Sequence, residues 1–484
     1  MDVTTARGVV RGLDQDGITV FRDIPYAAAP TGAARFAPPA EHEPWQGVRD
    51  ATKFGPTAPQ SPRVLGEMDM RAYFGGWHRG EDYLTVNVWT PDTEATGLPV
   101  MVFVHGGGFV AGSGCSELYD GSAFARDGVV LVTVNYRLGI AGFLDIPGAP
   151  PNRGLLDVVA ALRWVRENIA AFGGDPGTVT VFGQSAGATI VSGLLATPEA
   201  TGLFRRAIVQ SGSGLGAFSP GQASLVTRRA AGLLAVEPTV DGFAGVPDEG
   251  LVETAAKLAG IDLRTATHTD PLAGLSPFSL VLATQPADAL VADVDLLTGT
   301  NAEEGNLYLV PFGTYATSTG TDVDALAAKA HPDPVRLVKT YREQRPAAAD
   351  GEIRSAILGD ALFGAGTWAL AEAHGSRTFA YEFAWRSPAL SRELGAAHTV
   401  ELPFVFGRTG LPGLRGPNGV LGADDPPSSL VTRVHRTWVR FARTGDPGWP
   451  AYTADRRTTM RFDLDSGTVD DPRGAERQAW RSAR

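Results

Sequence analysis

The sequence predicts an α/β protein with a doubly wound, mostly parallel central sheet. Short apolar segments rich in valine and isoleucine alternate with longer segments of helical periodicity, which is typical of parallel strands joined by crossover helices. Several short segments are apolar on both faces, as expected of strands that helices cover above and below. The first 25 residues have the pattern of short hairpins, so we also expect a small N-terminal antiparallel sheet.

The elements of this sheet can be placed along the chain. A helix is predicted over 155–172, where apolar residues recur at helical spacing until Gly173 and Gly174 end it. The predicted strands of the central sheet cover residues 85–89, 99–104, 129–134, 178–182, 206–209, 295–298 and 378–383.

Two alanine-rich segments contain helical patterns without strands, roughly at 215–290 and 310–375. We expect them to be helical cap insertions over one end of the sheet. No segment has the composition of a linker, and internal repeats are absent. We therefore expect a single domain over residues 1–484.

Composition excludes several classes of function. The chain has 42 Lys and Arg against 53 Asp and Glu, a net charge of −11, which argues against a nucleic-acid or anionic membrane surface. No apolar run approaches the roughly 18 residues that cross a bilayer. Cys115 is the only cysteine, so neither an intramolecular disulfide nor a cysteine metal site can form. The first ten residues lack the pattern of a signal peptide, and we expect a cytoplasmic location.

Ser185 is the first candidate catalytic residue. It lies at the centre of Gly183-Gln184-Ser185-Ala186-Gly187, directly after a predicted strand and before an apolar helical segment. A strand that reverses into a helix strains the central residue and holds its hydroxyl beside the positive end of that helix. The alternative is a glycine-rich turn with an N-capping serine, but the continuous turn, strand and elbow over 172–188 favour a nucleophile.

A glycine-rich loop supplies candidate donors for a negatively charged oxygen. His105-Gly106-Gly107-Gly108 follows a second predicted strand, and its backbone N–H groups are free of side chains that would block them. A flexible loop or a phosphate cradle is the alternative, although no Gly-Lys-Ser/Thr follows. With Ser185 present, we predict an oxyanion hole formed by the N–H groups of Gly107, Gly108 and Ala186.

A serine nucleophile needs a base and an acid, which follow the serine in this architecture in the order acid, then histidine. Position favours His398, which lies between a small-residue loop and an apolar segment, over the others that follow Ser185: His268, His331, His374 and His435. Glu303 and Glu304, in a turn after the predicted strand at 295–298, are both candidates for the acid.

Taken together, these motifs resemble the type B carboxylesterase family of α/β-hydrolases, which includes bacterial para-nitrobenzyl-type esterases and, more distantly, the cholinesterases. The resemblance covers nearly the whole chain in order. It is carried by "GITVFRDIPYAAAPTGAARFAPP" (17–39), "EDYLTVNVWTP" (81–91), "PVMVFVHGGGF" (99–109), "VNYRLGIAGFL" (134–144), "GLLDVVAALRWVRENIAAFGGDPGTVTVFGQSAGA" (154–188), "GTNAEEGNLYL" (299–309) and "AAHTVELPFVFG" (396–407).

The resemblance implies roles for individual residues. Ser185 would be the nucleophile, Glu304 the acid and His398 the base. Phe109 would flank the oxyanion hole and Phe218 would line the acyl pocket, although core packing is the alternative for both. The resemblance also implies two ion pairs, which would join Arg35 to Glu81 and Arg137 to Asp157.

Two departures argue against a cholinesterase-like protein. The family's cysteine after "ED" is Tyr83 here, and Gln184 stands where cholinesterases carry a glutamate. We expect a serine carboxylic-ester hydrolase that forms an acyl-enzyme on small-molecule esters and needs no metal or cofactor. The alternatives are the same machinery acting on amides, carbamates or acyl transfer, or a non-catalytic binding protein on this fold.

Overall fold

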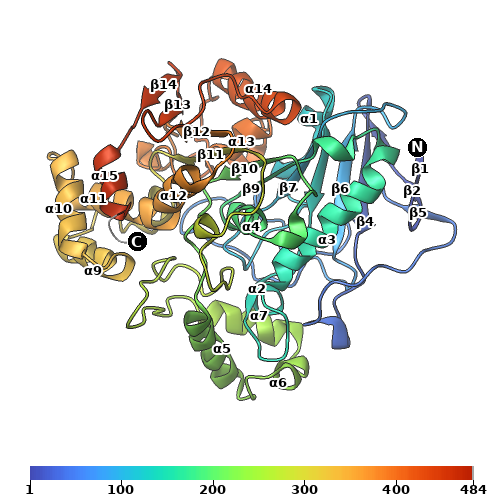
Figure 1. Ribbon diagram of the computed structural model, residues 1–484, viewed down its shortest axis with the longest axis horizontal. Helices are drawn as coiled ribbons and strands as arrows, with labels where there is room; N and C mark the ends of the chain where they lie inside the picture. The colour runs from blue at the N-terminus through green and yellow to red at the C-terminus, as the bar shows by residue number, and fades with distance from the viewer. Residues whose placement is uncertain (482–484) are drawn as a thin grey trace.

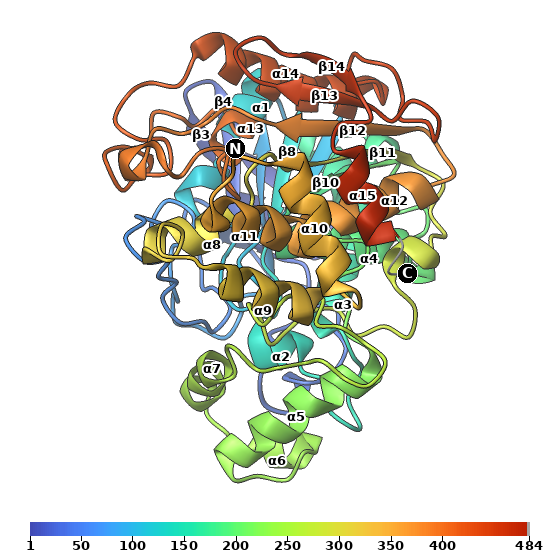
Figure 2. The ribbon, with the colours of Figure 1, turned by 90° about the vertical axis from the view of Figure 1, so that its left-hand side faces the viewer.

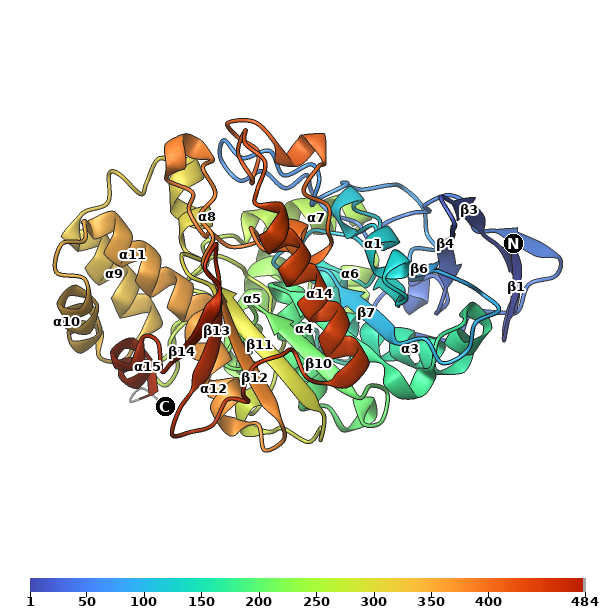
Figure 3. The same ribbon diagram turned by 90° about the horizontal axis from the view of Figure 1, so that it is seen from above.

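An eleven-stranded sheet runs across the protein. The computed structural model describes residues 1–481. The strands lie in the order β14-β13-β12-β11-β10-β9-β7-β8-β6-β4-β3, from C-terminal strands on one side to N-terminal strands on the other (Figure 3). They are β3 (Leu13–Gln15), β4 (Ile18–Pro25), β6 (Thr85–Thr90), β7 (Val100–Val104), β8 (Val130–Val134), β9 (Thr180–Gln184), β10 (Arg206–Gln210), β11 (Asp295–Asn301), β12 (Thr378–Phe383), β13 (Thr458–Phe462) and β14 (Gly467–Asp470).

The centre of this sheet is parallel and its margins are antiparallel. Strands β8, β7, β9, β10, β11, β12 and β13 pair in parallel, whereas β3, β4 and β6 at one margin and β14 at the other pair antiparallel. The predicted α/β class with a mostly parallel, doubly wound sheet is confirmed. β7 pairs with β8 on one side and β9 on the other, so the winding direction reverses at β7. Ligands of open α/β sheets bind at the carboxyl ends of strands beside such a reversal.

The chain begins with two hairpins, as predicted. β1 (Asp2–Thr5) and β2 (Gly8–Arg11) pair antiparallel in a small separate sheet, which β5 (Val48–Asp50) joins in parallel. The second hairpin, β3 and β4, extends the main sheet instead. All seven predicted central strands are present, with bounds that differ by a few residues.

Helices cover both faces of the sheet. They are α1 (Ser122–Arg126), α2 (Gly139–Phe143), α3 (Arg153–Asn168), α4 (Ala186–Leu195), α5 (Pro220–Leu234), α6 (Val240–Ala244), α7 (Asp248–Lys257), α8 (Asn306–Leu309), α9 (Gly320–Ala330), α10 (Pro334–Gln344), α11 (Asp350–Gly359), α12 (Ala365–Ala373), α13 (Leu402–Val405), α14 (Ser428–Thr444) and α15 (Gly474–Arg481). In Figure 1, α5, α6 and α7 lie together at the bottom and α9, α10 and α11 at the left, and Figure 2 shows the same two groups from the side.

The alternation of side chains along β7 divides the interior into two cores. Val102 packs on one face with residues of α3 and α4, such as Val158 and Ile190. Phe103 points to the other face, where it lies 5.0 Å from Phe406 and shares a cluster with residues of α1 and α14. Burial on both faces explains why β7 has no polar residue, and it makes the sheet a rigid support for the loops at its carboxyl edge.

Candidate active site

Ser185 occupies a strained turn between β9 and α4. Its backbone has φ 58° and ψ −125°, a positive φ that non-glycine residues rarely adopt. The two flanking glycines make this turn possible: a Cβ on Gly183 would lie 2.6 Å from the carbonyl carbon of Gly187, and a Cβ on Gly187 would overlap the carbonyl oxygen of Val104. Ser185 also makes no side-chain hydrogen bond that caps α4. Together with the strained backbone, this excludes the alternative of an ordinary N-capping serine.

His398 and Glu304 form a buried hydrogen-bonded pair near this turn. Nδ1 of His398 lies 2.6 Å from Oε2 of Glu304, and both side chains are almost fully buried. The other carboxylate oxygen of Glu304 accepts a hydrogen bond of 2.7 Å from the backbone N–H of Asn301, at the end of β11. The Phe363 ring stacks on the imidazole with centroids 4.2 Å apart. These contacts fix the orientation of the ring and leave Nε2 as the ring nitrogen that faces away from Glu304.

Ser185 and His398 line the same cavity of about 50 Å³, together with the glycine loop. The Nε2 atom of His398 accepts from the side-chain amide of Gln184, whose nitrogen lies 3.2 Å away. An Nε2 that accepts requires the proton on Nδ1, where Glu304 receives it. The tautomer assigned by these contacts is therefore the one in which Nε2 can act as a base.

The glycine loop after β7 lies against the turn of Ser185. A Cβ on Gly106 would lie 3.1 Å from the Cβ of Ser185, and Gly107 and Gly108 have φ values of 120° and 64°. His105 anchors the start of the loop, because its ring stacks on Tyr136 at 4.4 Å and its Nδ1 hydrogen-bonds to the carbonyl of Gly106 at 2.8 Å. Burial lowers the pKa of His105 to about 4, so this ring is neutral.

A second buried carboxyl group, Glu401, lies close to this hydrogen-bonded pair. Its oxygens accept from the side chains of Asn301, at 2.7 Å, and Gln210, at 3.4 Å. Burial, and then the neighbouring charge of Glu304, raise the pKa of Glu401 to about 7. Sequence reasoning missed this residue, although a glutamate inside the apolar segment 400–406 was a signal for it.

The two predicted substrate-binding phenylalanines lie in the protein core. Phe109 is buried and packs edge-on against Phe143 at 4.9 Å, and Phe218 is buried where its backbone bridges to Val281. The cavity that holds Ser185 is lined instead by aromatic residues from elsewhere: Tyr73, Phe74, Tyr119 and Tyr308. The geometry favours the core-packing alternative for both, and their contact with substrate stays a prediction.

The structure confirms one predicted ion pair and corrects the other. Arg137 and Asp157 are fully buried, with Nη2 2.7 Å from Oδ1, and Arg137 also donates to the carbonyl of Ala37. The predicted pair between Arg35 and Glu81 is wrong. The guanidinium of Arg35 points toward the start of α7, where it donates to the carbonyl of Val246 and lies 3.4 Å from Asp248, while Glu81 is exposed.

The other four histidines that follow Ser185 in the sequence make contacts elsewhere or are exposed. His268 is exposed, His374 hydrogen-bonds to Thr378, His331 contacts the backbone of Asp333 and Ala479, and His435 contacts the carbonyl of Val405. Among residues 1–481, no group of three or more His, Cys, Asp or Glu could hold a metal ion. Within the same residues, no helix is both long and apolar enough to span a bilayer.

Comparison with known proteins agrees with this geometry. The model of the carboxylesterase family matches residues 1–480. The chain belongs to the carboxylesterase family. It is an enzyme of the carboxylesterase type with the α/β-hydrolase fold, as the sequence predicted.

Relatives within the carboxylesterase family match over most of their length. The chain is 35% identical to para-nitrobenzyl esterase of Bacillus subtilis, over 98% of this chain and 97% of the relative. It is 34% identical to phenmedipham hydrolase of Pseudarthrobacter oxydans, over 93% and 92%. The crystal structure of carboxylesterase EST55 of Geobacillus stearothermophilus superposes with a TM-score of 0.86 at 35% identity, covering 99% of both chains.

Proposed function

We propose that this carboxylesterase hydrolyses small-molecule esters through an acyl-enzyme on Ser185, with His398 as the base and Glu304 as the acid of the triad. The observation that carries the proposal is the buried contact of 2.6 Å between His398 and Glu304, at the cavity that contains the strained turn of Ser185. A hydroxyl held at such a turn beside an oriented imidazole is the arrangement that activates a serine.

In the first half of the reaction, Nε2 of His398 takes the hydroxyl proton while Oγ of Ser185 attacks the ester carbonyl carbon. The hydroxyl then takes the place of the Gln184 amide at Nε2. Negative charge develops on the carbonyl oxygen, where the N–H groups of Gly107, Gly108 and Ala186 would receive it. Glu304 stabilises the imidazolium, which returns its proton to the leaving oxygen, so that the alcohol departs and the acyl group stays on Ser185.

In the second half, water repeats the same steps. His398 takes a proton from water, the hydroxide adds to the acyl carbon, and the imidazolium protonates Oγ of Ser185 as the acid leaves. Each proton passes through Nε2, and none is transferred to Glu304. The hydrogen bond from the N–H of Asn301 holds the Glu304 carboxylate in place through both halves of the reaction.

The direct test is hydrolysis of para-nitrophenyl esters from acetate to decanoate. Ser185→Ala should lower kcat by roughly 10⁶-fold. Ser192→Ala is a matched control, because Ser192 is buried on α4 and its hydroxyl donates to the carbonyl of Ala188 within the same helix. Equal activity of Ser185→Ala and the wild type would refute the proposal.

A further inference from the structure

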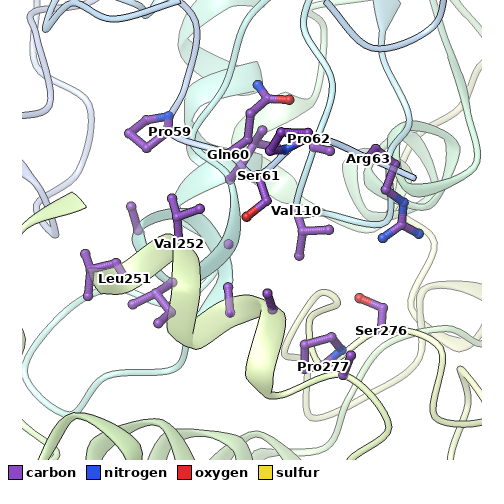
Figure 4. Close-up of a pocket in the computed structure, with 18 of the residues that line it drawn as sticks. Pro59, Gln60, Ser61, Pro62, Arg63, Val110, Leu251, Val252, Ser276 and Pro277 are labelled. Carbon is purple, nitrogen blue, oxygen red and sulfur yellow. The ribbon is translucent and has the colours of Figure 1, made fainter. Parts of the chain in front are cut away.

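Arg63 stands between two cavities beside the oxyanion loop. It lines the cavity of about 50 Å³ that contains Ser185 and also a larger one of about 290 Å³, and it is the only described residue common to both linings. Figure 4 shows the larger cavity, with the guanidinium of Arg63 at one end beyond Val110 and with Leu251 and Val252 toward the other. A substrate that extends from Ser185 toward the larger cavity therefore passes this cation.

The guanidinium of Arg63 has no partner of its own. Among residues 1–481 it makes no hydrogen bond and no ion pair, although its side chain is partly buried and burial lowers its pKa. A guanidinium carries five N–H donors and stays charged, so a half-buried one without a protein acceptor leaves its donors open to an anion in the cavities. Two fully buried arginines show the contrast: Arg137 meets a carboxylate and Arg153 meets backbone carbonyls.

The surroundings of Arg63 supply no competing anion. Among the described residues, no Asp or Glu lines the cavity of Ser185, and the acidic residue lining the larger cavity, Asp248, pairs with Arg35 at 3.4 Å. A terminal nitrogen of the guanidinium lies 3.7 Å from where a Cβ on Gly108 would stand. The cation is thus adjacent to the loop that faces the reacting carbonyl, with open space on both sides.

We propose that Arg63 binds a free carboxylate carried by the substrate, so that this enzyme prefers esters with a second, unesterified acid group. The inference rests on the proposed function, since it assigns the substrate class of the same site. Planar guanidinium and carboxylate groups form paired hydrogen bonds, and such a contact replaces the missing partner of Arg63. The apolar wall of the larger cavity, with Leu251 and Val252, suits the carbon chain of such a substrate.

Two pairs of esters test this inference, each pair matched in shape. Monoethyl adipate and its neutral amide, ethyl 5-carbamoylpentanoate, place the charge on the acyl side of the ester. The pair 4-acetoxybenzoate and 4-acetoxybenzamide places it on the leaving group. We expect kcat/KM of the wild type to be about ten- to a hundred-fold higher for the acid of at least one pair, the range for hydrogen bonds to a charged group. The pair that responds identifies the side on which the carboxylate is bound.

Variants of Arg63 decide whether the guanidinium causes the preference. Arg63→Gln should abolish it by raising KM for the acid substrate far more than for its neutral partner, and Arg63→Lys should restore part of it. Arg71→Gln is the control, because Arg71 is exposed and pairs with Asp69 nearby on the same loop.

Three results would overturn the inference. The wild type could lack a preference for either acid, Arg63→Gln could retain the preference, or Arg63→Gln could lower kcat equally for acid and neutral esters, which would mean that Arg63 acts on the oxyanion. In each case the neutral esters still report on Ser185. Failure of the proposed function would appear separately, as hydrolysis of the neutral esters that survives in Ser185→Ala.

Discussion

Glu304 holds His398 through a contact of 2.6 Å between Oε2 and Nδ1, while its other oxygen is held by the backbone at Asn301. The backbone therefore holds one oxygen of the carboxylate, and the other oxygen meets the imidazole. Since both side chains are almost fully buried, their attraction is little screened by water. Of the two neighbouring glutamates in this turn, Glu304 therefore contacts the imidazole, whereas Glu303 does not.

Replacing each glutamate in turn separates these roles. Glu304→Gln should lower kcat by about 10⁴-fold, because a neutral amide no longer holds the tautomer with the proton on Nδ1 or stabilises the imidazolium. Glu303→Gln should lower kcat far less, since Glu303 pairs with Arg386 and an amide oxygen can still accept from the N–H of Ala396. Steady-state kinetics with a para-nitrophenyl ester measures both. Losses of equal size would show that Glu304 has no special place in the reaction.

The glycines of the oxyanion loop should differ in their tolerance of a methyl group. A Cβ on Gly107 would overlap the carbonyl oxygen of Ala111, whereas a Cβ on Gly108 would have nothing nearer than Arg63 at 3.7 Å. Gly107→Ala should therefore shift the loop and lower kcat by at least 10²-fold, the usual loss for one oxyanion donor. Gly108→Ala should cost mainly about 1 kcal/mol of backbone strain at its positive φ. Steady-state kinetics measures the loss of kcat, and thermal unfolding measures the loss of stability. A Gly107→Ala variant more active than Gly108→Ala would contradict the assignment of Gly107 to the oxyanion hole.

Glu401 should make the stability of the protein depend on pH. Its pKa is raised from the ordinary 4.5 to about 7, so the folded state keeps a proton that the unfolded state loses between these values. The free energy of unfolding should therefore fall as pH rises from 4.5 to 7, by roughly 3 kcal/mol from this group. Glu401→Gln cannot titrate, so it should gain stability relative to the wild type over this window. Urea unfolding at intervals from pH 5 to pH 8 measures the difference, and a constant difference would contradict the prediction.

The buried pair of Arg137 and Asp157 should be essential for folding. Asp157→Asn would leave a guanidinium without its counter-charge in a site with no access to water, which typically costs about 3–5 kcal/mol. The surface pair of Arg440 and Asp446 is a suitable comparison, and Asp446→Asn should cost less than about 1 kcal/mol. Denaturant unfolding of the two variants gives both values. Similar losses would show that the buried pair has no structural role.

Much of the fold was predictable because the central strands are apolar on both faces. Strand β7 has a valine, methionine or phenylalanine at every position, a pattern that few other structures produce. Strands β13 and β14 lack this pattern, and the sequence did not predict them. They lie at the margin of the sheet and carry exposed residues such as Arg461 and Val469. The small N-terminal sheet was expected, but not that the second hairpin would extend the main sheet.

The site was predictable where chemistry is local in the sequence. The glycines around Ser185 and the loop from His105 to Gly108 follow strands directly, so their places at the carboxyl edge follow from the topology. Contacts between segments that are far apart in the sequence produce no local sequence pattern, so they were not predicted. The Phe363 ring on His398 comes from the helical segment before α12, and the direction of the Arg35 guanidinium depends on α7. Arg63 was missed because a single arginine in a loop has no pattern.

The most direct measurement of the central claim is the mass of the protein after reaction with an organophosphate that mimics the tetrahedral intermediate. We predict one adduct per chain, located by peptide mapping at Ser185, with loss of esterase activity in proportion to labelling. His398→Ala should slow the labelling strongly, because the serine then lacks its base. An adduct at another residue, or full activity in the labelled enzyme, would contradict the account.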